Sequence, residues 1–362
     1  MSTRRDFLKT GTAAVATGIV FCGCGLLKSA HAQQPARQKL PVMVGGKRIK
    51  TIDVHAHCLF SEASALLGPI APSPIRGADE VVVDIDKRLA AMDAQAIDME
   101  VLSINPAWYG RDRDLAGQVV KLQNEKLAEL CASKPDRFAA FASLTLQAPD
   151  LAVQELETAV KKQGLRGAAI GGNVNGVAFS DEKFHPVWAK AEELGVPLFI
   201  HPQGVPELNK QLAGNGWLSN AIAFPLETTI ALSHLIFEGT FDRYPNLKVI
   251  AAHGGGFLPS YADRSDHACL VNPSACPPGI KLKKQPTEYL KQIYFDSLVF
   301  TPEAIRHLAA QVGAGQLVLG SDYPYRWQLE PVDHIFACTS LSDDEKAGVL
   351  GHNAAKLLNF ET

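Results

Sequence analysis

The chain has 362 residues, of which 46% are hydrophobic and 20% are charged, and its formal net charge is −3. This composition provides a large hydrophobic core without the help of disulfide bonds. No block of lysine or arginine stands out, which argues against nucleic acid or an anionic membrane surface as a partner. The first 32 residues contribute +3 to the net charge, with four basic residues and Asp6, so the remainder carries −6.

The N-terminal segment has the pattern of an export signal. Arg4 and Arg5 form a twin-arginine pattern, a mildly apolar stretch covers residues 10–27, and residues 30–32 are a small-x-small cleavage motif. The apolar stretch is rich in Gly, Ala and Thr and ends at that motif, which argues against a transmembrane anchor. Cys24 is an alternative lipid-attachment residue, but the residues before it are a poor context for one. We expect a signal peptide at 1–32, an arm or linker at 33–47 and a catalytic domain at 48–362, exported to the periplasm or secreted.

Strands and helices alternate along the whole catalytic domain. Eight short apolar runs read as strands: one ending at His57, then 99–104, 138–144, 165–170, 197–201, 247–252, 293–296 and 316–320. Helices are expected at 84–95, 114–134, 148–163 and 184–194, from Pro225 to Gly239, and from the turn at 254–256 onward. Eight βα units favour a closed α/β fold, the (β/α)8 TIM barrel, over an open doubly wound sheet. No Gly-x-Gly-x-x-Gly motif follows the first strand, which argues against a dinucleotide-binding fold.

Four of these strands are followed at once by a residue of a type that binds metal ions. His55 and His57 end the first strand, His201 the fifth, His253 follows the sixth and Asp322 follows the eighth. The carboxyl ends of barrel strands meet at one mouth, where active sites are built. A single histidine at a strand end is more often a hydrogen-bonded surface residue than a ligand. Here four strand ends carry such residues, and each strand occupies its proper place in the alternation of strands and helices. This combination predicts a metal site instead.

The expected chemistry of the site follows from the ligand types. His55 and His57 are two residues apart, so both point to one face of their strand. A catalytic zinc site typically uses three protein ligands plus water. The pair of His55 and His57 cannot complete such a set of ligands alone, so His201 and Asp322 are the natural additions. His253 is then free to act as a general acid or base, beside a water whose pKa a metal ion lowers toward 7.

The cysteines leave one pairing open. Five of the seven lie beyond residue 32, and they include no C-x-x-C zinc pair. Cys269 and Cys276 flank a proline-containing loop and would pair in an oxidising compartment. Free, partly buried thiols are the alternative that we prefer from the sequence.

Several segments resemble amidohydrolase-related metal-dependent decarboxylases, and most of all the aminocarboxymuconate semialdehyde decarboxylase group. These segments are residues 52–57, 92–95, 224–229, 239–243, 245–248, 253–256 and 320–324. The resemblance covers residues 50–360. It implies one divalent ion, zinc or else manganese, bound by His55, His57, His201 and Asp322, with His253 as the catalytic acid/base and Asp322 taking part in catalysis. Because no lysine stands at the end of the fourth strand, at residues 167–173, a site for one metal ion is expected.

The resemblance also points to substrate-binding residues. Arg264 matches the position of an arginine that reaches the substrate carboxylate of a neighbouring subunit, which implies a homodimer. Arg76 matches an arginine ahead of the first helix, although its loop departs from the family pattern. Guanidinium groups bind carboxylates through two hydrogen bonds. The alternative for Arg264 is a surface ion pair, and the alternative for Arg76 is a solvated loop residue without a function. Trp217 is a candidate for the wall of the substrate pocket, and its alternative is plain core packing.

Together these features predict non-oxidative decarboxylation of an unsaturated or aromatic carboxylic acid, a small-molecule substrate. Two alternatives remain: a hydrolase or hydratase with the same site acting on a lactone, ester or activated double bond, and an exported metal-binding protein without turnover.

Overall fold

The computed structural model describes residues 41–68, 75–276 and 279–360. The predicted signal peptide and residues 33–40 of the predicted arm lie outside the described residues. The described end of the arm is an antiparallel hairpin of β1 (Met43–Val44) and β2 (Lys47–Arg48). Gly45 and Gly46 join the two strands with φ angles of 54° and 77°, which suits the two-residue turns that connect twisted strands.

Eight parallel strands form the centre of the domain. They are β3 (Ile52–His57), β4 (Met99–Ser103), β5 (Phe138–Ala140), β6 (Ala168–Ile170), β7 (Pro197–Ile200), β8 (Lys248–Ala251), β9 (Ile293–Asp296) and β10 (Leu317–Val318). β3 to β5 pair in chain order, and so do β6 to β10. Parallel bridges Ala142–Ala168 and Asp53–Leu319 connect the two groups at both sides. The strands therefore close on themselves, and the prediction of a TIM barrel is confirmed.

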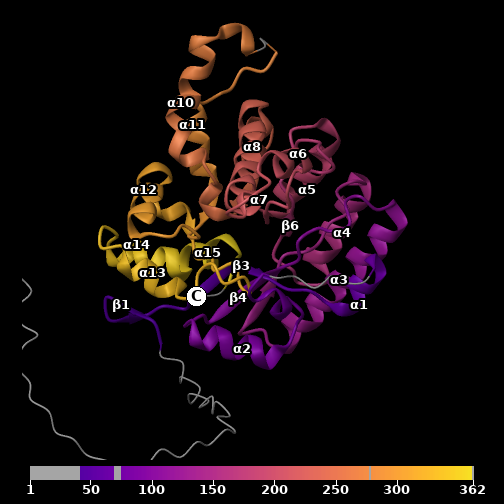
Figure 1. The fold of residues 1–362 in the computed structure, drawn as a ribbon, viewed down its shortest axis with the longest axis vertical. Coiled ribbons are helices and arrows are strands. Elements are labelled where there is room, and N and C mark those ends of the chain that lie inside the picture. Colours follow the sequence, from indigo (N-terminus) through magenta and orange to yellow (C-terminus); the bar gives the residue numbers. More distant parts are fainter. Residues whose placement is uncertain (1–40, 69–74, 277–278, 361–362) are drawn as a thin grey trace, which may run out of the picture. The chain divides into compact units, whose positions relative to one another are not determined.

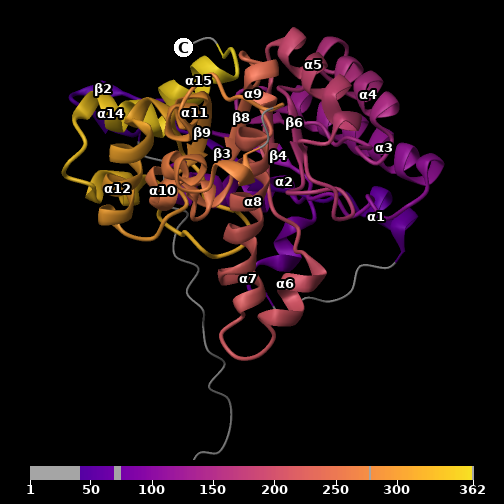
Figure 2. The same cartoon turned by 90° about the horizontal axis from the view of Figure 1, so that it is seen from above.

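Helices surround the strands (Figure 1). The connections between strands contain α1 (Ser61–Leu67), α2 (Ile85–Ala94), α3 (Arg113–Ser133), α4 (Pro149–Lys161), α5 (His185–Leu194), α6 (Pro206–Gln211), α7 (Leu218–Ala221), α8 (Ala223–Phe237), α9 (Thr240–Arg243), α10 (Leu258–Val271), α11 (Pro286–Tyr289) and α12 (Pro302–Val312). After β10 come α13 (Pro331–Ala337), α14 (Asp343–Ala347) and α15 (Asn353–Leu357). Figure 2 shows α6 and α7, which follow β7, projecting away from the barrel to one side.

Local sequence signals explain where the main helices begin and end. The Asp112 carboxylate accepts hydrogen bonds from the backbone of residues 114 and 115 and so caps α3. Proline occupies the first turn of α4, α5, α10 and α12, where its missing N–H costs nothing. Gly195 ends α5 in the left-handed conformation that glycine adopts without strain.

The hydrophobic core has two parts. The larger part lies between the strands and the helices, and the smaller one fills the barrel interior with residues such as Val54, Phe141, Phe199 and Ile250. Ala354, Ala355 and Leu357 of α15 belong to the interior part. α15 therefore packs into one end of the barrel and leaves the other end for the site.

One segment in the outer layer has an unusual composition. By length and composition alone, residues Leu218–Phe237 are apolar enough to cross a membrane. Glu227 in its centre is buried and accepts hydrogen bonds from the backbone of Gln203 and Gly204, after β7. These contacts tie the segment to the barrel.

The preference for free thiols at Cys269 and Cys276 is wrong, because these residues form a disulfide. Cys269 lies near the end of α10, and a short turn at Pro273–Ala275 brings the chain back. The two Cα atoms are 5.7 Å apart, which is the usual separation in a disulfide. Cys58, Cys131 and Cys338 are free thiols.

Candidate metal centre

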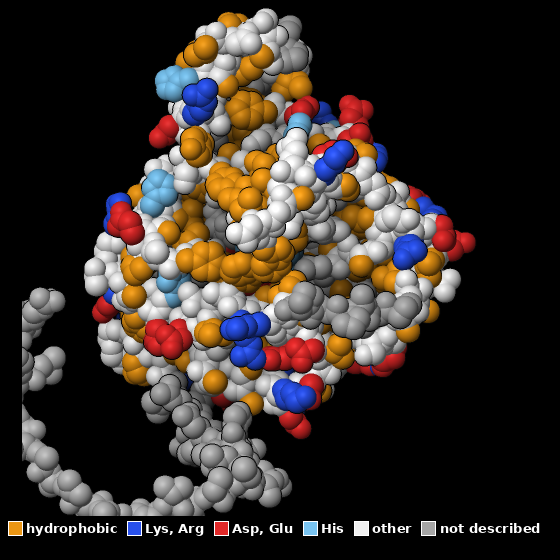
Figure 3. Space-filling model, in the orientation of Figure 1, with side chains coloured by type: hydrophobic (Ala, Val, Ile, Leu, Met, Phe, Trp, Pro, Cys, Tyr) orange, Lys and Arg blue, Asp and Glu red, His pale blue; other side chains and the backbone are white. Residues whose placement is uncertain are grey.

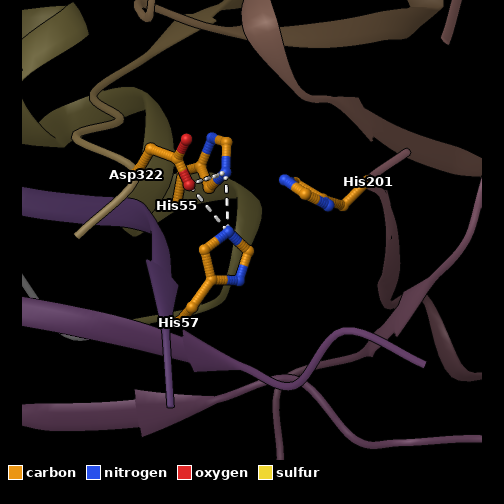
Figure 4. A group of neighbouring side chains, drawn as sticks. All are labelled: His55, His57, His201 and Asp322. Atoms are coloured by element: carbon orange, nitrogen blue, oxygen red, sulfur yellow. Dashed lines mark hydrogen bonds and ion pairs between the residues drawn. The ribbon is translucent and has the colours of Figure 1, made fainter. Parts of the chain in front are cut away.

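Four ligand side chains meet inside the mouth of the barrel. His55 and His57 lie on β3, His201 directly follows β7, and Asp322 lies four residues after β10. Their candidate ligand atoms all lie within 4.8 Å of one another, and the four residues are buried. Figure 4 shows His55, His57 and Asp322 close together, with the ring of His201 approaching from the opposite side.

An irregularity in β3 turns both histidines into the barrel. Ile52 and Val54 belong to the interior part of the core, whereas Ala56 belongs to the outer part. Strict alternation would place all three on one face and the histidines on the other. The pairing of β3 with β4 shifts between Asp53 and Ala56, and such a bulge redirects the side chains that follow it.

Hydrogen bonds behind the two histidines fix which ring nitrogens face the cluster. His55 Nδ1 lies 2.6 Å from the Asp296 carboxylate, so this nitrogen carries the proton. His57 Nδ1 lies 3.2 Å from the Ser103 hydroxyl, which itself donates to the Ala56 carbonyl and therefore accepts from the ring. In both rings the unprotonated Nε2 is left to face the cluster.

This arrangement fits a cation. The two Nε2 atoms are 3.1 Å apart, and they lie 3.2 Å and 2.9 Å from Oδ1 of Asp322. Two lone pairs and a carboxylate oxygen at these distances repel one another unless positive charge lies between them. His201 Nδ1 is also buried, and it has no hydrogen-bond partner among the described residues. Imidazole nitrogens and a carboxylate are ligands for divalent transition metals, so the cluster is a metal site of three histidines and one aspartate.

The electrostatics of the cluster lead to the same conclusion. Burial lowers the pKa of His55, but Asp322 and Asp296 outweigh this effect and raise that pKa to about 10. Burial and the neighbouring imidazoles hold the pKa of His201 well below its usual value. Although burial opposes ionisation of Asp322, the neighbouring histidines keep its pKa well below the usual range. The site therefore favours one localised positive charge and excludes several protonated rings.

Backbone contacts bring Asp322 to the histidine strand. Its N–H donates to the His55 carbonyl at 2.8 Å, and its φ of 62° is uncommon for a residue other than glycine. The buried Asp53 carboxylate accepts hydrogen bonds from the His55 N–H and from the N–H and hydroxyl of Ser321. Burial and the nearby Glu100 raise the pKa of Asp53 to about 7. Asp53 thus connects the first strand of the barrel to the last.

His253 lies beside the cluster. Its Nε2 is 3.8 Å from Oδ2 of Asp322, its Nδ1 has no partner among the described residues, and its φ is 55°. The His253 N–H donates to Asp296, and the N–H of Gly254 does the same. The turn requires glycine at Gly256, where a Cβ atom would lie 2.0 Å from the Pro225 carbonyl oxygen. A strained residue at such a place is a candidate for a functional role.

A cavity of about 350 Å³ opens above the cluster. His201, His253 and Asp322 line its floor. Its walls are Ile75, Asn105, Gln203, Asn209, Trp217, Ser219, Asn220, Phe224, Tyr325 and Trp327. Trp217 is one of these lining residues, and its contact with a substrate stays a prediction. Among the described residues that line this cavity there is no arginine or lysine.

The two predicted arginines lie elsewhere. Arg76 is exposed and lines a second, outer cavity together with Trp217 and Tyr325. Arg264 is exposed on α10 and does not line the cavity of its own chain. Its contact with the substrate of a neighbouring subunit stays a prediction.

Several residues that support the site were not singled out from the sequence. Asp296 follows the same rule as the ligands, since it ends β9, and this position was the available signal. Arg88 on α2 pairs with the buried Glu100 at 2.6 Å and also donates to the His57 carbonyl, so it fixes the end of β3. Glu227 holds the loop after His201, and burial raises the pKa of this carboxylate. No local pattern marks Arg88 or Glu227 for these contacts.

Comparison with known proteins identifies the family to which this chain belongs. The amidohydrolase family model matches residues 52–360. The chain belongs to this amidohydrolase family. The 2-amino-3-carboxymuconate-6-semialdehyde decarboxylase of Dictyostelium discoideum is 33% identical over 282 residues, which cover 77% of this chain and 77% of that protein. The gamma-resorcylate decarboxylase of Rhizobium radiobacter is 31% identical over 297 residues, covering 76% of this chain and 87% of that protein.

A solved structure of an amidohydrolase relative gives the same fold. It is the 5-carboxyvanillate decarboxylase of Novosphingobium aromaticivorans, complexed with manganese and 4-hydroxy-3-methoxy-5-nitrobenzoic acid. The TM-score is 0.78 at 25% identity, and the alignment covers 86% of this chain and 96% of that one. The resemblance to metal-dependent decarboxylases predicted from the sequence is thus confirmed at the level of the family. The bound manganese of that relative supports a divalent metal in this fold.

Proposed function

We propose that this amidohydrolase is a metal-dependent carboxy-lyase, which removes carbon dioxide without oxidation from an aromatic or unsaturated carboxylic acid. The observation that carries the proposal is the buried cluster of His55, His57, His201 and Asp322, with His253 beside it, which reaches a cavity through His201, His253 and Asp322. The relatives at 33% and 31% identity are decarboxylases, which supports this reaction over hydrolysis.

A bound divalent ion supplies positive charge that stabilises the negative charge developing on the substrate. When carbon dioxide leaves, the electron pair of the broken carbon–carbon bond remains on the substrate carbon, and this carbon must gain a proton. Asp322 Oδ2 and His253 Nε2 lie 3.8 Å apart at the floor of the cavity, and we assign the proton transfer to this pair. Nδ1 of His253 has no hydrogen-bond partner among the described residues.

The cavity walls suit an aromatic acid with hydroxyl groups. Phe224 and Tyr325 offer ring faces, while Asn105, Gln203 and Asn209 offer neutral hydrogen-bonding groups. A benzene-sized ligand fits a cavity of about 150 Å³, so 350 Å³ holds one substituted ring. We infer that the carboxylate lies toward the metal ligands, since the described walls carry no guanidinium group.

Zinc is the ion that we propose from the ligand set, with manganese as the alternative. Three histidines and one aspartate bind either ion. Elemental analysis of protein purified without added metal distinguishes the two, and activity restored to chelator-treated protein by each ion shows which one is functional.

The reaction is tested with metal-loaded protein and a panel of hydroxybenzoic and dienoic acids, with release of carbon dioxide as the readout. A parallel panel of lactones and esters tests the hydrolase alternative. The His352→Asn variant, which changes an exposed histidine outside the site, serves as a control with unchanged turnover. Hydrolysis of the second panel without any release of carbon dioxide would refute the proposal.

We also propose export through the twin-arginine route, with residues 1–32 as the leader. Arg4 and Arg5 support this, and so does the disulfide between Cys269 and Cys276, because disulfides persist in oxidising compartments. Sequencing the N-terminus of the protein recovered from the cell envelope tests the cleavage site. An unprocessed N-terminus on cytoplasmic protein alone would contradict the proposal.

A homodimer in which Arg264 reaches the neighbouring site is a further proposal. The exposed position of Arg264 on α10, outside the cavity of its own chain, is compatible with it. Mixing Arg264→Ala protein with a His253→Asn variant tests it, because mixed dimers would contain one site with both residues intact. Activity recovered on mixing supports a shared site, and no recovery despite subunit exchange refutes it.

A further inference from the structure

The metal-site cavity adjoins a larger one. The outer cavity has a volume of about 910 Å³, compared with about 350 Å³ for the inner one. The two share the lining residues Ile75, Trp217, Tyr325 and Trp327. A ligand bound over the metal ligands would therefore have its far side against the residues that also line the outer cavity.

The wall of the outer cavity is an exposed aromatic surface. The rings of Trp217 and Trp327 stack with centroids 5.5 Å apart and an interplanar angle of 13°, and the ring centroid of Phe300 lies 5.9 Å from that of Trp327. Trp217 is 42% exposed and Phe300 57%, and the outer lining residue Leu329 is 56% exposed. Figure 3 shows a hollow bordered by hydrophobic side chains on the face toward which α6 and α7 project. Contiguous exposed apolar surface with a polar rim marks a binding site.

The charged residues at the rim balance one another. Two arginines, Arg76 and Arg326, and two carboxylates, Asp79 and Glu80, line this cavity, and Arg326 pairs with Glu80 at 2.5 Å. The described residues that line the outer cavity thus carry no net charge. An uncharged group suits it better than a second carboxylate, although the sequence had suggested Arg76 as a carboxylate ligand.

The backbone of Trp217 has a strained conformation. Its φ is 51°, a left-handed conformation that is rare for a bulky side chain, and it precedes the short helix α7 in the segment after β7. The indole in this position both stacks on Trp327 and lines the two cavities. Strain of this kind is retained where the position of a side chain matters for function.

We propose that the outer cavity binds a second, uncharged aromatic ring of the substrate, so that the preferred substrate is an aryl-substituted aromatic acid. This inference rests on the proposed decarboxylation. The reacting ring occupies the inner cavity, and the second ring packs on Trp327 and Leu329. The volume supports it, because the inner cavity accommodates one substituted ring and the outer one is more than twice as large.

Binding is tested without turnover by titrating metal-loaded protein with 4-phenylphenol and following tryptophan fluorescence. Trp108 and Trp188 are fully buried, so quenching by this ligand reports on Trp217 and Trp327. Leu329→Ala keeps both fluorophores and should weaken binding several-fold. Leu66→Ala, which changes an exposed leucine outside the cavity, is the matched control and should bind like the unchanged protein.

Turnover is tested with a hydroxybenzoic acid and its phenyl-substituted counterpart. We expect kcat/KM to be about tenfold higher for the longer acid, equivalent to about 1.4 kcal/mol, through a lower KM. The advantage should shrink in Leu329→Ala and in Trp327→Ala, and persist in Leu66→Ala.

The outcomes separate the two proposals. Quenching by 4-phenylphenol that Leu329→Ala weakens, without decarboxylation of any acid, supports the outer binding site and refutes the proposed reaction. Decarboxylation of the short acid, without quenching and without any advantage for the longer acid, refutes the outer site alone. Quenching that is equal in Leu329→Ala and in the unchanged protein also refutes it.

Discussion

Replacement of Asp296 by asparagine is predicted to weaken metal binding although Asp296 is not itself a ligand. Its Oδ2 accepts from His55 Nδ1 at 2.6 Å and from the His253 N–H at 2.9 Å, while Oδ1 accepts from the N–H groups of Gly254 and Leu298. In Asp296→Asn, one oxygen becomes an NH2 group that cannot accept. If this group replaces Oδ2, it meets two N–H donors.

The magnitudes follow from these contacts. His55 keeps a partner only by moving its proton to Nε2, which removes the lone pair that faces the cluster. Loss of such a supporting partner lowers metal affinity by about 10- to 100-fold. The His253 N–H becomes a buried unpaired donor, which costs about 1–3 kcal/mol of folding stability. The expected loss of stability is thus smaller in the metal-free protein than in the metal-bound one, because only the latter also loses binding energy.

Two measurements check this prediction. Competition with a chromogenic chelator gives the metal affinity, and denaturant unfolding with and without metal gives the two stabilities. Asp344→Asn, at an exposed position on α14, is the control and should leave both unchanged. Metal affinity within twofold of the unchanged protein would show that Asp296 does not set the orientation of His55.

Three further predictions test other parts of the structure. His253→Asn should retain the metal ion by elemental analysis but lose turnover by about 10²- to 10⁴-fold, and near-normal release of carbon dioxide would remove His253 from catalysis. Glu100→Ala leaves the buried Arg88 guanidinium without its carboxylate and should cost about 3–5 kcal/mol in denaturant unfolding. The double variant Arg88→Met/Glu100→Leu should be less destabilised than Glu100→Ala, and equal losses would contradict the ion-pair explanation. Burial raises the pKa of Glu155 from 4.5 to about 7 although Thr145 donates to it, so the folded state binds more protons than the unfolded chain between these values. Relative to Glu155→Gln, the free energy of unfolding should fall by up to about 3 kcal/mol from pH 4.5 to 7, and parallel pH profiles for the two proteins would refute this.

The barrel and the four ligands could be predicted because both depend on regular patterns. Each ligand lies at or shortly after the carboxyl end of a short apolar strand, and parallel strands in a barrel bring such positions together. The alternation rule placed His55 and His57 on one face, but it did not reveal that a bulge is needed to turn that face inward. The bulge arises from pairing with the neighbouring strand β4, which the sequence of β3 does not encode by itself.

The remaining features depend on contacts between distant segments. Asp296 lies 241 residues from His55, and only the closed barrel brings the two together. The disulfide depends on the turn that brings Cys276 back to Cys269, whereas free thiols were the alternative preferred from the sequence. The outer cavity depends on how the segment with Trp217 folds over the residues that follow Asp322, which no local pattern predicts.

The closure of the barrel between its first and last strands has a consequence for the order of assembly. His55 is made early in synthesis, whereas Asp322 and the α15 residues that fill the opposite end come near the end of the chain. A ribosome-bound chain that stops before β10 lacks the final ligand and the partner of Asp53 at Ser321. The complete set of four ligands therefore exists only after nearly the whole polypeptide has been translated. Only the nearly completed chain can bind the ion with full affinity.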